Sequence, residues 1–176
     1  IKRAVEAAGG SAEFSIDGSF LGDVPEFAIA VFGESPYAEG AGDLSTLEYQ
    51  AGVKEDLAML LGLRQQGISV VSIFLSGRPM WVNAELNASD AFVAAWLPGT
   101  EGAGIADVIF KGSDLTTKYD FSGKLSFSWP KRPDQTVLNR YDADYDPLFP
   151  FGFGLTYSDI DVLGELVTDG LMAVSY

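Results

Sequence analysis

Three short apolar segments, at residues 27–32, 68–75 and 91–96, are the clearest pattern along the chain. Each is apolar almost without interruption, and the second is rich in β-branched residues, which is typical of strands that are buried on both faces. Each is followed by a loop that contains glycine or proline. We therefore predict a buried strand at each of the three segments.

The pattern of polar and apolar positions between these segments indicates helices. The clearest helix covers residues 53–66 and ends at Gly67. Four leucines are expected to share its buried face: Leu57, Leu60, Leu61 and Leu63. A second helix is expected at residues 105–111. Residues 1–10 indicate a helix already under way at the first residue and closed by glycine, so we interpret the chain as part of a longer polypeptide.

Strand, helix and strand alternate at the spacing of right-handed βαβ units, so the predicted fold class is α/β with a mainly parallel sheet. The remaining segments depart from this pattern. Residues 12–16 indicate a short strand, residues 123–129 alternate like an antiparallel or edge strand, and residues 163–175 indicate a strand without a partner. The aromatic segment 148–155 is expected to pack against a domain edge rather than to bind a ligand.

The composition restricts both the chemistry and the partners. The formal net charge is −14, from 25 acidic against 11 basic residues among 176, and it would repel nucleic acids and anionic membranes. No apolar segment is long enough to span a bilayer. The chain contains neither cysteine nor histidine, so thiolate metal sites are excluded and proton transfer within it must use Asp, Glu, Lys or Tyr.

Charged residues follow the predicted strands, at the positions where ligands bind in open α/β sheets. Glu34 and Glu39 lie in the glycine-rich loop 33–43 after the first strand. Arg78 follows the second strand, and Glu101 lies among glycines after the third. Because the carboxyl ends of parallel strands share one edge of a sheet, we expect these groups to gather there. The combination indicates carbohydrate chemistry.

At these loops the sequence resembles the second domain of glycoside hydrolase family 3, which contains β-glucosidases and exo-β-glucanases. Five motifs carry the resemblance: GESPYAEGAGD (33–43), LSGRP (75–79), AAWLPGTEGAGIADVIF (94–110), SGKLSFSWP (122–130) and YDPLFPFGFGLTY (145–157). The similarity is greatest to the exo-1,3/1,4-β-glucanase branch. It implies a three-layer α/β/α sandwich over residues 1–157, truncated at its N-terminus, and the start of a following segment or linker at residues 158–176.

The resemblance also implies a mechanism that uses two domains. Glu39 matches the position of the family's general acid/base, and the nucleophilic Asp would come from a (β/α)8 barrel domain of the same polypeptide. The substrate would be a β-glucan or β-gluco-oligosaccharide, cleaved at its non-reducing end with retention of configuration. This chemistry requires no cofactor, and the binding of a structural Ca²⁺ or Mg²⁺ is left open. The expected location is secreted or periplasmic.

The sequence leaves the roles of the other candidate residues open. Glu34 is expected to brace loop 33–43 through backbone N–H groups. Arg78 either forms a bracing ion pair, with Glu101 as a candidate partner, or contacts a sugar. Glu101 could equally cap the helix that follows it, and Trp96 is expected in the core. The alternative function is a non-catalytic carbohydrate-binding or interaction module on the same sandwich fold.

Overall fold

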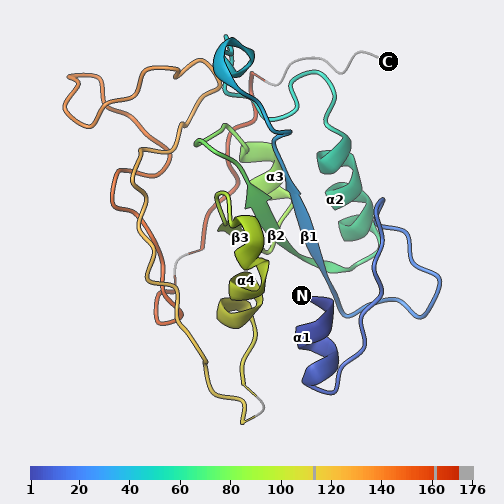
Figure 1. Cartoon of the computed structure of the whole chain (residues 1–176). Coiled ribbons are helices and arrows are strands. Elements are labelled where there is room, and N and C mark those ends of the chain that lie inside the picture. Colours follow the sequence, from blue (N-terminus) through green and yellow to red (C-terminus); the bar gives the residue numbers. More distant parts are fainter. Residues whose placement is uncertain (113, 161, 171–176) are drawn as a thin grey trace.

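A three-stranded parallel sheet forms the centre of the molecule (Figure 1). The structure, a computed structural model, describes residues 1–112, 114–160 and 162–170. The sheet has the order β1 (Phe27–Gly33), β2 (Ser69–Leu75) and β3 (Ala91–Ala94). The three predicted strands and their parallel arrangement are therefore confirmed. The third strand ends at Ala94, earlier than predicted, because the chain turns at Trp96, which has a φ of 53°.

The helices are α1 (Lys2–Ala7), α2 (Glu55–Gln65), α3 (Asn83–Asn87) and α4 (Gly102–Ile109), with the 3₁₀ turns η1 (Glu39–Gly42) and η2 (Gly99–Glu101). Helices α2 and α3 connect successive strands, whereas α1 precedes the first strand and α4 follows the last. The sequence pattern did not predict α3, and α4 begins and ends earlier than the predicted helix. Within the described residues, no helix has the length and apolarity that crossing a membrane requires.

One face of the sheet packs against α2 and carries most of the core. Leu60 and Leu63 of α2 are fully or almost fully buried against alternate residues of the strands. Leu61 is 44% exposed, so the prediction that it shares the buried face is wrong. Successive helix residues are rotated by about 100°, so Leu61 points away from the direction of Leu60. Leu57 and Leu63 each lie about one turn from Leu60 and share its face.

The opposite face of the sheet is covered unevenly. Ile105 and Val108 of α4 line a small apolar pocket together with Val93 of β3, on the face that points away from α2. This places helices on both faces, as in an α/β sandwich. At the other edge of the sheet, Phe27 and Val31 of β1 are 45% and 48% exposed. The face is therefore closed over β3 and open over β1.

The remaining predicted strands do not form. Residues 12–16 and the described part of 163–175, which ends at 170, contain no strand, and the rest lies outside the described residues. Segment 123–129 pairs antiparallel with the aromatic segment at two points only. Trp129 bridges to Phe149, and the N–H of Leu125 donates to the carbonyl of Phe153 at 2.8 Å. The predicted antiparallel segment is thus present as isolated bridges rather than as a strand.

Candidate active-site loop at the carboxyl edge of the sheet

Loop 33–43 leaves the sheet at the end of β1, and its 3₁₀ turn η1 lies beyond the carboxyl edge of the strands (Figure 1). β1 pairs with β2 in a register that sets Gly33 opposite Leu75. The residues that follow these two strands are therefore neighbours, and Glu34 and Arg78 meet. A Cβ on Gly33 would lie 1.9 Å from the carbonyl oxygen of Leu75, so only glycine allows this close departure.

Glu34 and Arg78 form an ion pair that is largely shielded from solvent. Nε and Nη2 of Arg78 donate to Oε1 of Glu34 at 3.0 and 2.7 Å. The hydroxyl of the buried Ser76 lies 2.8 Å from Oε2 of the same carboxylate. The side chains are 21% and 10% exposed, so the pair is screened less than a surface salt bridge. Arg78 therefore pairs with Glu34, and the suggested pair with Glu101 is not formed.

Arg78 also reaches the far end of the same loop. Its Nη1 donates to the carbonyl oxygen of Gly42 at 2.5 Å. Its guanidinium carbon lies 4.4 Å from the centre of the Tyr37 ring, in the position of a cation–π contact. We call the contacts of Arg78 with Glu34, Tyr37 and Gly42 the Arg78 network. Tyr37 was not among the residues predicted from the sequence, although it lies within the GESPYAEGAGD motif.

Glu39 is the first residue of η1 and is exposed to solvent. Its φ is 48°, in the left-handed region that costs a residue with a side chain about 1–2 kcal/mol. Among the described residues, none forms a hydrogen bond or an ion pair with its carboxylate. The carboxylate is therefore available to another molecule or domain. Left-handed residues other than glycine are concentrated at active sites and ligand contacts.

A groove of about 840 Å³ adjoins this loop. Its lining includes Gly42, Asp43 and Arg78, together with residues 126–128 and 135–141, which we call the second wall. Tyr141 is 82% exposed on that second wall, and the guanidinium of Arg140 lies 4.6 Å from its ring centre. The groove thus combines aromatic, amide, hydroxyl and charged groups.

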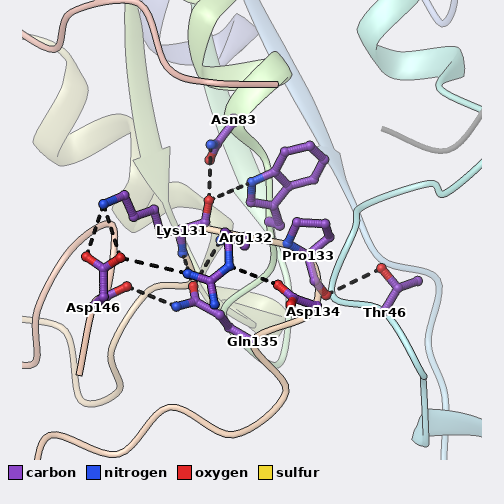
Figure 2. Close-up of polar contacts among 9 residues, drawn as sticks. Thr46, Asn83, Lys131, Arg132, Pro133, Asp134, Gln135 and Asp146 are labelled. Carbon is purple, nitrogen blue, oxygen red and sulfur yellow. Dashed lines mark hydrogen bonds and ion pairs between the residues drawn. The ribbon is translucent and has the colours of Figure 1, made fainter. Parts of the chain in front are cut away.

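The second wall is held in place by hydrogen bonds between side chains and backbone groups (Figure 2). The carbonyl of Lys131 accepts a hydrogen bond from the indole N–H of the buried Trp81 at 3.0 Å. The side chain of Gln135 accepts from the N–H groups of Lys131 and Arg132 and donates to the carbonyl of Asp146. These contacts fix the start of a segment that contains no helix or strand, so the wall has a defined position.

Glu101 lies apart from the Arg78 network. It is exposed, and its carboxylate accepts a hydrogen bond from the hydroxyl of Thr100 at 3.1 Å. It occupies the N-cap position of α4, but its side chain makes no capping hydrogen bond.

Trp96 packs against the core as expected, with its ring centre 6.0 Å from that of Trp129. Within the described residues, no group of three or more Asp or Glu side chains could hold a metal ion.

Comparison with protein families gives a match to the glycosyl hydrolase family 3 C-terminal domain over residues 23–157. The periplasmic beta-glucosidase of Salmonella typhimurium is 28% identical over 160 residues, which cover 78% of this chain and 20% of that protein. The xylan 1,4-beta-xylosidase of Xylanibacter ruminicola is 33% identical over 143 residues, 74% of this chain and 16% of that protein. The chain thus spans a fifth or less of the length of these relatives.

Two solved structures show the same fold. An exo-1,3/1,4-beta-glucanase from a Pseudoalteromonas species is 54% identical, with a TM-score of 0.93, over 96% of this chain and 21% of that one. A beta-glucosidase from Listeria innocua, in complex with gluconolactone, is 25% identical with a TM-score of 0.61, over 88% of this chain and 26% of that one. The carboxyl-edge loops described above therefore lie in a domain whose relatives are parts of much longer glycosidase chains.

Proposed function

Since the chain belongs to glycosyl hydrolase family 3 through its C-terminal domain, we propose that it supplies the general acid/base of a retaining, exo-acting β-glucosidase or β-glucan exohydrolase. Glu39 is the proposed acid/base. The observation that carries this assignment is its conformation: an exposed carboxylate, held in the left-handed region on a turn beyond the carboxyl edge of the sheet. Glu34, by contrast, is engaged by Arg78 and Ser76.

The proposed reaction uses a second carboxylate from outside this chain. An Asp on a (β/α)8 barrel domain of the same polypeptide would attack the anomeric carbon while Glu39 protonates the leaving oxygen. Glu39 would then take a proton from the water that hydrolyses the glycosyl-enzyme ester. Retention requires the two carboxyl groups to lie about 5–5.5 Å apart, so the barrel must cover η1. The reaction needs no cofactor, since both steps are proton transfers coupled to substitution at carbon.

The proposed substrate is the non-reducing end of a β-linked glucan or gluco-oligosaccharide. The exo-1,3/1,4-beta-glucanase is 54% identical to this chain, and solved beta-glucosidase structures from Listeria innocua contain glucose or laminaribiose. A xylosidase is also among the relatives, at 33% identity. Comparing nitrophenyl β-glucoside with nitrophenyl β-xyloside therefore tests the sugar directly, and we expect the glucoside to be the better substrate.

We further propose that residues 1–157 belong to the sandwich domain and that residues 158–176 begin a following segment. The described part of this segment contacts the sandwich through α3, where Asn83 and Asn87 donate to the carbonyls of Val167 and Leu166, both at 2.8 Å. Similarity to a periplasmic beta-glucosidase supports a secreted or periplasmic location.

The test is Glu39→Gln in the full-length polypeptide, with Glu55→Gln as the matched control, because Glu55 is an exposed carboxylate on α2. General acid/base groups contribute about 10²–10⁴-fold, so Glu39→Gln should lower kcat/KM by that amount for alkyl glucosides and oligosaccharides. Dinitrophenyl glucoside should be affected far less in kcat/KM, since its leaving group needs no proton. Azide should restore turnover and yield the β-glucosyl azide.

Two results would contradict the proposal. An equal, small loss on all substrates would mean that another group is the acid/base. Normal binding of oligosaccharides without hydrolysis by the wild-type full-length polypeptide would favour the alternative, a non-catalytic carbohydrate-binding module on the same fold.

A further inference from the structure

Loop 33–43 is anchored at both of its ends by one side chain. Arg78 donates from Nε and Nη2 to Glu34, the first residue after Gly33, and from Nη1 to the carbonyl of Gly42, the last residue of η1. A planar guanidinium has five N–H donors in a fixed arrangement, so it can hold two acceptors at a set separation. The distance between the two ends of the loop is therefore fixed by Arg78.

The middle of the loop is held by the same guanidinium. The Tyr37 ring lies over it at 4.4 Å, and the same ring packs against Gly42. A Cβ on Gly42 would lie 2.6 Å from Cδ2 of Tyr37, closer than two carbon atoms can approach without displacement. The ring is thus in contact with both the guanidinium and the backbone of η1.

Glu39 lies between these contacts along the chain. Tyr37 precedes it by two residues and Gly42 follows it by three, and the turn between them is closed by the N–H of Ala41, which donates to the carbonyl of Ala38 at 3.2 Å. The Glu39 side chain itself has no partner among the described residues. Its position therefore depends on the backbone of η1, and that backbone depends on the Arg78 network.

The positive charge of Arg78 and the negative charge of Glu34 offset each other within the Arg78 network. Arg78 brings a positive charge into contact with the loop, and Glu34 pairs with that charge at 2.7 Å. An unpaired guanidinium beside an acid/base carboxylate would favour the ionised form of that carboxylate and so oppose proton donation. Pairing with Glu34 allows Arg78 to hold the loop without adding a net charge next to it.

We infer that Arg78 is the positioning residue of the acid/base, acting through Glu34, Tyr37 and Gly42 to fix where Glu39 meets the glycosidic oxygen. The inference rests on the proposed role of Glu39. A shift of about 1 Å in a catalytic group can reduce the rate by about 10²-fold. Loss of Arg78 should therefore reproduce the Glu39 defect while Glu39 is still present.

Lysine at this position keeps the charge but not the geometry. A single ammonium cannot donate to Glu34 and to the Gly42 carbonyl in the arrangement of the guanidinium, and it does not stack on Tyr37 as a plane. Arg78→Lys should therefore recover only a small part of the activity that Arg78→Met loses. A role that needs only a positive charge predicts full recovery instead.

The experiment compares Arg78→Met, Arg78→Lys and Glu39→Gln in the full-length polypeptide, with Arg64→Met as control. Arg64 forms an Arg–carboxylate pair with Asp90 at 3.0 Å, near the amino ends of β2 and β3, away from loop 33–43. For Arg78→Met we expect kcat/KM to fall by about 10²-fold on alkyl glucosides and much less on dinitrophenyl glucoside. Azide should accelerate this variant, because azide does not require the base. Arg64→Met should match the wild type.

The outcomes distinguish an error in the positioning role of Arg78 from an error in the proposed role of Glu39. If Glu39→Gln shows the leaving-group dependence and Arg78→Met does not, the positioning role is wrong and the proposed function stands. If neither shows it, the proposed function itself fails. If Arg78→Met loses activity equally on all substrates, without azide acceleration, Arg78 supports folding only. To detect misfolding, the far-ultraviolet circular dichroism and melting temperature of each variant are measured beside the kinetics.

Discussion

The ammonium of Lys54 lies 3.0 Å from Oε1 of Glu85, and solvent reaches only 6% of one side chain and none of the other. Lys54 Nζ also lies 3.4 Å from Glu48 and donates to the carbonyl of Tyr49 at 2.6 Å. Two buried carboxylates thus share one cation between the segment that precedes α2 and the short helix α3. Burial raises the pKa of Glu85, and the charge of Lys54 only partly opposes this.

Lys54→Met should be one of the most damaging substitutions in the chain. It removes the cation of a buried ion pair with Glu85, which typically costs about 3–5 kcal/mol of stability. Lys131→Met is the control, because its pair with Asp146 is half exposed and should change stability by less than about 1 kcal/mol. The measurement is urea unfolding of the 176-residue chain. Similar losses of unfolding free energy in Lys54→Met and Lys131→Met would show that the buried pair of Lys54 contributes no more than a surface pair.

The same substitution should depend on pH in a defined direction. The folded-state pKa of Glu85 is raised, so its contribution to stability is fully present below the unfolded value near 4.5 and is lost as pH rises through the folded value. Removing Lys54 raises that folded value further. We therefore expect the Lys54→Met defect to be smaller at about pH 5 than at about pH 8. A defect that is constant between these two pH values would show that Glu85 does not titrate there.

Gly42→Ala should disturb loop 33–43 without unfolding the domain. The new Cβ would lie 2.6 Å from the Tyr37 ring, which must then leave the guanidinium of Arg78. The matched control is Gly40→Ala, since a Cβ there meets no atom within 4 Å. If the proposed function is right, Gly42→Ala should reduce kcat of the full-length polypeptide on alkyl glucosides by at least about tenfold, within the range known for a displaced catalytic group. Equal activities of the two variants would sink this prediction.

Trp129→Ala should destabilise the domain strongly. Trp129 is 3% exposed and lies 6.0 Å from Trp96 and 6.5 Å from Phe74, measured between ring centres. Removing a buried aromatic side chain costs about 3–5 kcal/mol. Phe127→Ala, at a side chain that is 62% exposed, should cost far less in the same unfolding experiment. The reverse order would mean that segment 123–129 packs differently from the structure.

The 176-residue chain by itself should not hydrolyse nitrophenyl β-glucoside, because the proposed nucleophile belongs to another domain. The measurement is release of nitrophenol by the purified chain, with the full-length polypeptide as positive control. Sustained release that Glu39→Gln abolishes would require a nucleophile within these residues and would overturn the two-domain mechanism.

The sheet was predictable from the sequence because continuous apolar segments of this length are characteristic of parallel strands. Helix α3 was not, since five residues provide too little periodicity, and Asn83, Ala84 and Glu85 are buried there through tertiary contacts. In segment 123–129, polar and apolar residues alternate as they do in a strand. Its partner contains Pro150, which has no N–H to donate, and pairing is limited to isolated points.

The location of the candidate site was predictable from the sequence, but the ion-pair partner of Arg78 was not. Strand ends indicated that Glu34, Arg78 and Glu101 would share one edge, and the sequence alone left the partner of Arg78 open. The pairing follows from strand register: Gly33 lies opposite Leu75, which brings Glu34 beside Ser76 and Arg78. Glu101 follows the third strand through η2 and lies apart. Register is a tertiary property that a single sequence does not specify here.

The open face and edge of β1 have a practical consequence for anyone who produces this domain in isolation. In the described part of the chain, β1 pairs only with β2, and Phe27 and Val31 are about half exposed on its uncovered face. An edge strand of this kind offers a template on which a second copy can add its own strand. Light scattering of the isolated chain should therefore rise with concentration and time, and Val31→Lys should suppress that rise. A charge at position 31 is therefore a simple way to keep the isolated protein monomeric in storage.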